Sequence, residues 1–227
     1  MKILLVAATA AEIRPFLNHL VPSGEQKGRL RHFTLNKKPV DVLVTGVGII
    51  PTAFCMGKCL PKGSYGMAVN AGICGSYRDD LVPGTVVEVT EDFPVELGAE
   101  EQGRFRDIFS LGLDRPGEWP FQDGKLVNMF PVLNAFTEKL IKVKGATVQT
   151  LGRNPEQLQL ITDTFHPDIE TMEGAAFLYS CLSERIPSIQ LRAVSNPVPE
   201  RDPAKWQTGL AVSRLNETLL EIMGLWG

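Results

Sequence analysis

Apolar runs and turn signals alternate along the chain in a pattern that predicts a sheet covered by helices. The segment 2–8 is a continuous apolar run, which is typical of a strand buried on both faces, and the segment 66–72 predicts another buried strand. The segments 30–35 and 39–45 predict a hairpin that turns at Asn36-Lys37-Lys38. Further strands are predicted at 84–90, 146–151, 169–172 and 188–194.

Helix signals lie between these strands. Thr9 can cap a helix over 10–20, and Pro51 suits the first turn of a helix that ends near Leu60. Asp202-Pro203 predicts the start of a long amphipathic helix, because the apolar residues after it recur at helical spacing. Other helices are predicted at 132–140, 156–165 and 173–185. Strands that alternate with helices indicate an α/β fold, and we expect one domain over residues 1–227.

The segment 97–125 departs from this pattern. It is rich in glycine, charged and aromatic residues and shows no clear period. A long irregular segment of this kind is typical of a lid, an interface or a mobile loop. Phe105 and Trp119 are candidates for covering a ligand or a neighbouring subunit. Three arginines either pair with an acidic substrate tail or lie in solvent: Arg104, Arg106 and Arg115.

Polar residues gather where the predicted strands end. In open α/β sheets, ligands bind at the carboxyl ends of the strands. Glu12 follows the first strand, and Glu173 follows the strand at 169–172; either carboxylate also suits a helix N-terminus for electrostatic reasons alone. The segment 168–201 contains six candidate site residues: Glu170, Met172, Glu173, Arg192, Ser195 and Asn196.

Composition and charge exclude several classes of protein. The 227 residues are 44% hydrophobic and 22% charged, as in ordinary globular proteins. A net charge of −3 argues against binding to nucleic acid. The apolar N-terminal run is too short to span a membrane and leads into Ala11-Glu12, so it indicates a strand rather than a signal peptide. We expect a cytoplasmic protein that binds neither nucleic acid nor membranes.

The cysteines and histidines do not predict a metal site. Cys55 and Cys59 lie on one face of a predicted helix, but zinc needs further ligands close by. The remaining thiols and imidazoles are scattered: Cys74, Cys181, His19, His32 and His166. We expect four ordinary thiols, with no metal and no organic cofactor.

These motifs together resemble the nucleoside phosphorylase/nucleosidase superfamily. Within it, the chain is similar to the branch of methylthioadenosine/adenosylhomocysteine nucleosidases and futalosine hydrolases. The Met172-Glu173 pair followed about twenty residues later by Arg192-x-x-Ser195 is the specific signal. The resemblance covers most of the chain, in the family's order: Glu12, Thr45-Gly46-Val47-Gly48, Asn70-Ala71-Gly72 with Gly75, and Glu170 to Ala176.

The resemblance implies a three-layer α/β/α sandwich with a mixed central sheet, and cleavage of a purine N-glycosidic bond. It implies that Glu12 activates water, that Glu173 binds the ribose 2′- and 3′-hydroxyls, and that Met172 packs under the ribose. It places Ser76 near the sugar and the water. It also implies that Arg192 holds a carboxylate or helps to place the site, that Ser195 belongs to the substrate site, and that the protein is a homodimer.

One residue departs from the pattern of the adenine-specific enzymes. They carry an Asp after the Ser as a proton donor to N7, whereas this chain carries Asn196. An amide cannot act as a general acid, but it donates hydrogen bonds. Hypoxanthine offers acceptors at N7 and O6, while adenine carries a donor at N6, so Asn196 suits a 6-oxopurine. Asp202 is a second candidate for the acid, although its place before Pro203 favours capping.

The leading hypothesis is hydrolysis of futalosine to hypoxanthine and dehypoxanthine futalosine, in menaquinone biosynthesis. A methylthioadenosine/adenosylhomocysteine nucleosidase is the first alternative. A purine nucleoside phosphorylase is the second; it needs a cationic phosphate pocket, for which only Arg14 lies near the first loop. A non-enzymatic nucleoside-binding module is the third, and the presence of both Glu12 and Glu173 argues against it.

Overall fold

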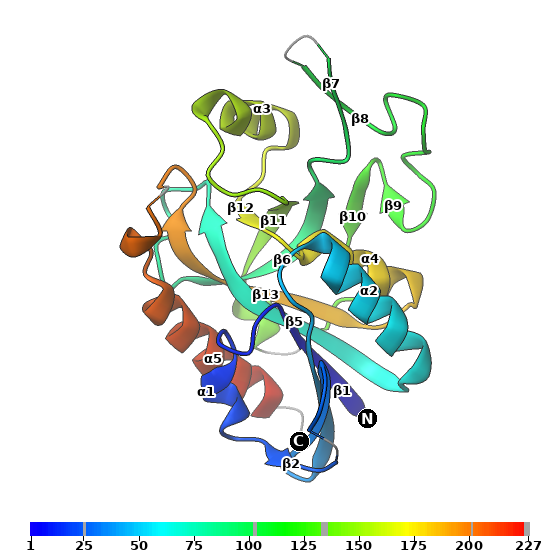
Figure 1. Ribbon diagram of the computed structural model, residues 1–227, viewed down its shortest axis with the longest axis vertical. Coiled ribbons are helices and arrows are strands. Elements are labelled where there is room, and N and C mark those ends of the chain that lie inside the picture. The colour runs from blue at the N-terminus through cyan, green and yellow to red at the C-terminus, as the bar shows by residue number, and fades with distance from the viewer. Residues whose placement is uncertain (25, 102–103, 133–135, 201, 225–227) are drawn as a thin grey trace.

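The computed structural model describes residues 1–24, 26–101, 104–132, 136–200 and 202–224. Its centre is an eleven-stranded mixed sheet (Figure 1). The strands at its core are β1 (Lys2–Ala7), β4 (Lys38–Val44), β5 (Tyr65–Ser76), β6 (Val86–Pro94), β11 (Ile141–Thr147), β12 (Ile169–Thr171) and β13 (Ser188–Pro197). Four further strands extend the two ends: β2 (Val21–Pro22), β3 (Leu30–Leu35), β9 (Phe121–Gln122) and β10 (Lys125–Val127).

The sheet closes on itself around β5. This strand pairs in parallel with β1 and β13 along its length and antiparallel with β12 at its end. β12 continues through β11 to β6, and β6 pairs with β13, so β5, β12, β11, β6 and β13 form a ring. The closure brings the ends of β5, β12 and β13 next to one another. The predicted mixed sheet is therefore confirmed.

Helices cover both faces of the sheet. The helices α2 (Ile49–Cys59) and α4 (Gly174–Ser183) pack together on one face, and α1 (Arg14–Leu17) and α5 (Thr208–Gly224) pack on the other (Figure 1). A fifth helix, α3 (Pro155–Phe165), begins with a capping box at Asn154. The three-layer α/β/α sandwich is thus confirmed.

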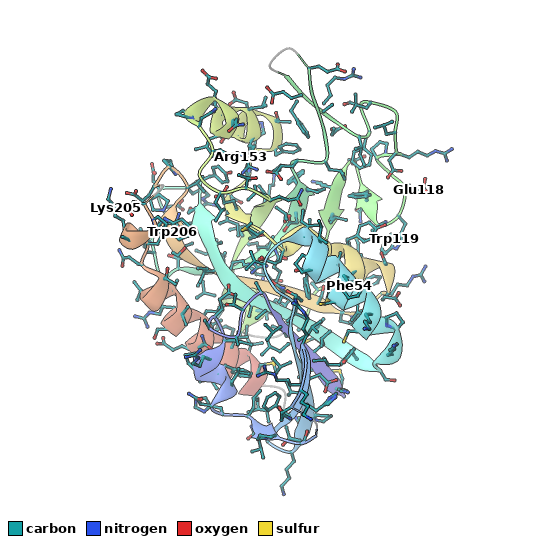
Figure 2. The ribbon with its side chains drawn as sticks, in the orientation of Figure 1. Phe54, Glu118, Trp119, Arg153, Lys205 and Trp206 are labelled. Carbon is teal, nitrogen blue, oxygen red and sulfur yellow. The ribbon has the colours of Figure 1, made fainter. Side chains whose placement is uncertain are left out.

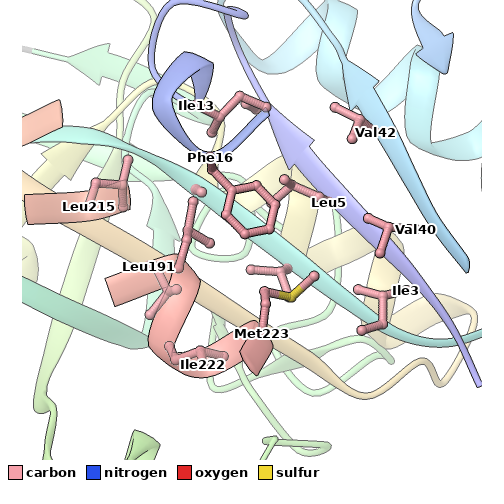
Figure 3. Packing of buried hydrophobic residues seen from close by; sticks show 14 of the residues in the cluster. Ile3, Leu5, Ile13, Phe16, Val40, Val42, Leu191, Leu215, Ile222 and Met223 are labelled. Carbon is pink, nitrogen blue, oxygen red and sulfur yellow. The ribbon is translucent and has the colours of Figure 1, made fainter. Parts of the chain in front are cut away.

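The alternation of side chains along β1 divides the core in two. Ile3 and Leu5 face α1 and α5, where they join Phe16, Leu191 and Leu215 in one cluster (Figure 3). The intervening residues of the strand face α2 and α4, where they join a second cluster: Leu4 and Val6 with Met56, Phe177 and Cys181. A continuous apolar run in the sequence follows from this burial on both faces.

Two predicted helices are shorter or lie elsewhere. The helix predicted at 10–20 is only α1, with Ile13 as its N-cap, so Thr9 does not cap it. The amphipathic helix α5 begins at Thr208, and Asp202 instead caps a 3-10 turn at Pro203–Lys205. In both places, a residue before the helix makes a hydrogen bond that is not helical. The N–H of Thr9 donates to the carboxylate of Glu12, and the N–H of Gln207 donates to the carbonyl of Ser195.

Other boundaries also differ from the predictions. The strand predicted at 146–151 is β11, which ends at Thr147, and the helix predicted at 132–140 is a 3-10 turn at Thr137–Lys139, with 133–135 outside the described residues. The segment 97–125 contains a hairpin of β7 (Gly98–Glu101) and β8 (Arg104–Asp107), so it is not irregular throughout. Within the described residues, no helix is long and apolar enough to cross a membrane.

Candidate active site

A cavity of about 300 Å³ lies at the carboxyl ends of the central strands. It is enclosed by the loop after β1, the end of β5, the junction of β12 with α4, the end of β13 and the start of α5. Trp206 lines it from the segment before α5 (Figure 2). Six candidate residues from the sequence also line it: Glu12, Glu170, Met172, Glu173, Ser195 and Asn196.

Three donors hold the carboxylate of Glu12. The backbone N–H and the hydroxyl of Thr9 both donate to Oε2 at 2.9 Å, and the backbone N–H of Ile73 donates to Oε1 at 3.2 Å. Asn216 of α5 fixes the backbone here, because its Nδ2 donates to the Glu12 carbonyl at 2.8 Å and its Oδ1 accepts from Phe16 N–H at 2.9 Å. Glu12 is therefore a fixed group of the loop before α1, not a residue of a helical first turn.

Glu173 is the N-cap residue of α4 and is 6% exposed. Its Oε1 accepts a hydrogen bond from the backbone N–H of Gly48 at 2.9 Å. Gly48 has φ of 100°, a conformation that glycine adopts without strain, so the glycine turn presents its N–H to a carboxylate of the protein itself. Burial raises the pKa of Glu173; the nearby charge of Arg192 and the Gly48 hydrogen bond oppose that rise, and the negative charge of Glu12 adds to it.

Arg192 lies behind both carboxylates and is 1% exposed. Its Nη1 is 4.0 Å from Oε2 of Glu173. It stands beside Gly72 of β5, where an added Cβ would lie 2.2 Å from Nη1 and 2.9 Å from Oε1 of Glu12. Among the described residues, its Nε and Nη2 have no hydrogen-bond partner. The buried guanidinium therefore offsets the charge of the two carboxylates without itself lining the cavity.

Asn196 reaches the cavity through an irregularity of β13. The register between β13 and β5 shifts between Val194 and Asn196, and such a bulge redirects the side chains next to it. The hydroxyl of Ser195 is 2.7 Å from Oδ1 of Asn196 and 3.1 Å from the carbonyl oxygen of Cys74. Nδ2 of Asn196 donates to the carbonyl of Pro197 at 3.0 Å and keeps a second N–H. Ser195 thus orients the amide.

The structure does not bring every predicted residue to the cavity. The hydroxyl of Ser76 donates to the carbonyl of Arg78 and accepts from the N–H of Arg78, and Ser76 does not line the cavity. Asp202 accepts from Ala204 N–H in its capping role and lies outside the cavity as well. Asp202 therefore has the capping contact that its place before Pro203 favours and is not among the residues that line the cavity.

The aromatic and basic candidates of the segment 97–125 also lie elsewhere. Phe105 packs on Phe165, and Trp119 packs on Phe130. Arg106 pairs with Glu101, and neither Arg106 nor Arg115 lines the cavity. The side chain of Arg104 lies outside the described residues. Of the three arginines, the two whose side chains are described therefore do not reach the cavity.

A buried network fixes the start of α4, which carries Glu173. Asp92 is fully buried and accepts from Thr147 Oγ1 at 2.6 Å and from Gln190 Nε2 at 3.0 Å. The Thr147 hydroxyl in turn accepts from the backbone N–H of Ala175 at 2.7 Å. An added Cβ on Gly174 would lie 2.2 Å from Oδ2 of Asp92, so this contact requires glycine. Burial raises the pKa of Asp92 to about 6.

Several contacts of the site carry no signal in the sequence. Ile73 acts through its backbone N–H, and Trp206 and Val212 line the cavity from a segment that the helical pattern assigns to the core. Asp92 lies in a strand whose sequence shows only strand character. Glu170, by contrast, was marked by its place before the Met-Glu pair and does line the cavity. In the described residues, no group of three or more His, Cys, Asp or Glu side chains gathers as metal ligands.

Known proteins that are similar to this chain include futalosine hydrolases and a 5′-methylthioadenosine/S-adenosylhomocysteine nucleosidase. Futalosine hydrolase of Thermus thermophilus is 28% identical over 187 residues, which cover 80% of each chain. Futalosine hydrolase of Streptomyces coelicolor is 27% identical over 227 residues, which cover 95% of this chain and 93% of that protein. The crystal structure of 5′-methylthioadenosine/S-adenosylhomocysteine nucleosidase from Helicobacter pylori superimposes with a TM-score of 0.81 at 18% identity, over 99% of this chain and 98% of that one. The family model of the phosphorylase superfamily matches residues 2–223, and the chain belongs to this superfamily.

Proposed function

We propose that this protein hydrolyses the N-glycosidic bond of futalosine and releases hypoxanthine and dehypoxanthine futalosine, a step of menaquinone biosynthesis. The proposal rests chiefly on one observation: Glu12, Glu173 and Asn196 line the same cavity from three different elements. The two relatives named futalosine hydrolase, at 27% and 28% identity, support the choice of substrate.

The geometry suits a dissociative cleavage. The bond between C1′ and N9 breaks, its electron pair leaves with the purine, and positive charge develops on the ribose. Glu12 accepts a proton from water as the water oxygen bonds to C1′. Glu173 accepts hydrogen bonds from the ribose 2′- and 3′-hydroxyls, and its negative charge stabilises the developing cation. Asn196 donates a hydrogen bond from its remaining N–H to the departing base, which leaves as an anion and takes up a proton from solvent, while Glu12 returns the proton of the attacking water to solvent. Met172 lies against the sugar.

Phosphorolysis and an adenine nucleoside suit the cavity less well. None of the described residues that line the cavity is Lys, Arg or His, so a phosphate dianion would lack a cationic partner there. An adenine nucleoside would place its N6 donors against the free N–H of Asn196, so that two donors would meet. A 6-oxopurine presents acceptors to the free N–H of Asn196.

We also propose that the protein works in the cytoplasm as a homo-oligomer. Its four cysteines are buried and unpaired, which agrees with a reducing compartment. Beside the cavity, Val47, Ile50 and Phe54 expose 53%, 75% and 67% of their surface along one loop and α2. A second copy that covers these apolar side chains would remove them from water. Sedimentation equilibrium at micromolar concentration measures the assembly directly.

The function is tested by chromatography of the base released from futalosine, inosine, methylthioadenosine and adenosylhomocysteine, with and without phosphate. We expect hypoxanthine from futalosine, independent of phosphate, and a loss of roughly 100-fold or more in kcat for Glu12→Gln, which removes the general base. Release of adenine at a comparable rate would contradict the proposed substrate. Release that requires phosphate would contradict hydrolysis, and no release from any nucleoside would favour a binding module.

A further inference from the structure

A second cavity, of about 530 Å³, is lined by residues of α2 and of the β3–β4 hairpin with the segments next to them. It is distinct from the active-site cavity, because none of the described residues lines both. A volume of this size lies in the range of about 300–1,000 Å³ that is typical of small-molecule sites. The proposed hydrolysis makes no use of it. Four of the side chains that line it are cations: Lys27, Arg29, Lys58 and Lys62.

The positive charge of this cavity is not offset within the described part of the chain. No Asp or Glu is among the described residues that line it. The ion pairs of the described residues all join other side chains, so none of the four cations is paired with a carboxylate there. Like charges around one hollow repel one another, and an anion inside the hollow converts this repulsion into attraction.

Arg29 is a fixed cation of the cavity wall. Its Nη1 donates a hydrogen bond to the carbonyl oxygen of Thr45, and the N–H of Val44 donates to the Arg29 carbonyl at 2.9 Å. The guanidinium lies against Gly46, where an added Cβ would be 2.9 Å from Nη1 and 3.7 Å from Nη2. A guanidinium has five N–H donors, so this anchor leaves donors for a ligand. A fork held in this way is suited to bidentate binding of a phosphate.

The same cavity has an apolar wall. Leu30 and Leu43 line it from the hairpin, and the largely exposed ring of Phe54 lines it from α2 (Figure 2). Nζ of Lys58 lies 5.7 Å from the centroid of the Phe54 ring, so a cation stands over the aromatic side chain. A ligand with a flat apolar body would cover these side chains while its charged head meets the cations.

We propose that this cavity binds a phosphate monoester with a flat apolar body. Such a head carries a charge of about −1.5 to −2 at pH 7, which offsets more of the four positive charges than a single carboxylate does. Its oxygens match the fork of Arg29 and the ammonium groups of the lysines. Its body covers Leu30, Leu43 and Phe54. The inference goes beyond the proposed function and does not depend on it.

The anchor of Arg29 also connects the second cavity with the active site. The turn that follows Thr45 leads to Gly48, whose N–H donates to Glu173 at 2.9 Å. A phosphate bound to Arg29 is therefore held by the same turn that supports a carboxylate of the active site. Phe54 belongs to the apolar surface that we propose a second copy covers, so binding is measured on the protein as it assembles in solution.

The first experiment titrates three probes into the unaltered protein by isothermal titration calorimetry at low ionic strength. Phenyl phosphate carries both the head and the ring, inorganic phosphate carries only the head, and benzenesulfonamide keeps the ring and a tetrahedral head without charge. We expect phenyl phosphate to bind at least about 10-fold more tightly than either of the other two, because each lacks one of the two contacts. Its affinity should fall as salt is added.

The second experiment locates the bound probe. Lys58→Gln combined with Lys62→Gln removes two of the four charges, and both side chains are exposed, so the fold should not change. We expect the affinity for phenyl phosphate to fall about 10-fold or more. Lys139→Gln is the matched control, because Lys139 is exposed but does not line the cavity, and it should bind the probe as the unaltered protein does.

Three results would overturn the inference. The first is that phenyl phosphate does not bind at millimolar concentration. The second is that inorganic phosphate binds as tightly as phenyl phosphate, since the cavity would then select charge alone. The third is that the double variant keeps the affinity of the unaltered protein, which would place the probe elsewhere. The proposed function is judged separately, by the release of hypoxanthine from futalosine.

Discussion

Substituting Gly72 by alanine should damage the site while leaving the fold largely intact. Gly72 lies in β5 beside Arg192 of β13. A Cβ at this position would lie 2.2 Å from Nη1 of Arg192 and 2.9 Å from Oε1 of Glu12. Carbon atoms and their neighbours pack at about 3.5 Å or more, so the guanidinium must move by roughly 1 Å. Both contacts are the far ends of side chains, and these are the ends on which the proposed chemistry depends.

The expected effects on stability and on activity differ in size. Overpacking a buried position costs about 1–3 kcal/mol, and here the low end applies because side-chain termini can give way. For a protein of this length, about 1 kcal/mol corresponds to a fall of roughly 2–4 °C in the melting temperature. A displacement of about 1 Å in a catalytic constellation can cost about 100-fold in rate. We therefore expect Gly72→Ala to lose about 100-fold in kcat/KM for futalosine with a small change in melting temperature.

Gly57→Ala provides a matched control. Gly57 lies in α2, and no atom lies within 4 Å of the Cβ that alanine would add. Alanine in a helix interior is favoured over glycine by about 0.5–1 kcal/mol, so this variant should be slightly more stable and fully active. Base release and thermal melting are measured on both variants. If Gly72→Ala keeps the activity of the unaltered protein, Arg192 and Glu12 are not tied to the reaction as proposed.

Two further substitutions test the supports of the site. In the folded state the pKa of Asp92 is raised to about 6 from its ordinary value of 3.8. Between these pH values the folded state therefore binds more protons than the unfolded state. The free energy of unfolding should consequently fall as pH rises from about 4 to 6, and this group contributes about 3 kcal/mol to the fall. Asp92→Asn should remove this part of the slope in urea titrations at several pH values, and equal slopes would contradict the assignment. Asn216→Ala leaves Phe16 N–H and the Glu12 carbonyl without their partner, so we expect a loss of about 1–3 kcal/mol in unfolding free energy and a lower kcat. Thermal melting and base release measure both, and an unchanged kcat would limit Asn216 to a structural role.

The buried strands were predictable from the sequence because their environment leaves a local trace. A strand covered on both faces is mainly apolar, and β1 and β5 are, apart from Lys2, Asn70 and Ser76. The hairpin of β3 and β4 was predictable for a similar reason, since Asn36 and Lys37 turn it with positive φ values of 51° and 66°. What the sequence does not contain is the order of the strands. The pairing of β13 with both β5 and β6 joins residues far apart in the chain.

The helix starts were harder to predict because capping signals also serve other contacts. Thr9 has the chemistry of an N-cap, but its hydroxyl and N–H bond to the carboxylate of Glu12. Asp202 does cap, yet it caps a 3-10 turn, and α5 begins six residues later, at Thr208. A capping residue in the sequence identifies a turn that needs an acceptor. It does not establish how long the helix after that turn will be.

The candidate site was also predictable from the sequence only in part. The charged side chains were predictable, because several of them follow the ends of buried strands, where ligands bind in open α/β sheets. The groups that hold those carboxylates were not, since the N–H of Ile73 and of Gly48 belong to the backbone and any residue supplies them. The sequence does record where such a backbone must come close, through glycine. Gly48 turns with positive φ, and Gly75 leaves room between Glu170 and Asn196, so a glycine beside a candidate carboxylate is itself evidence that the space is used.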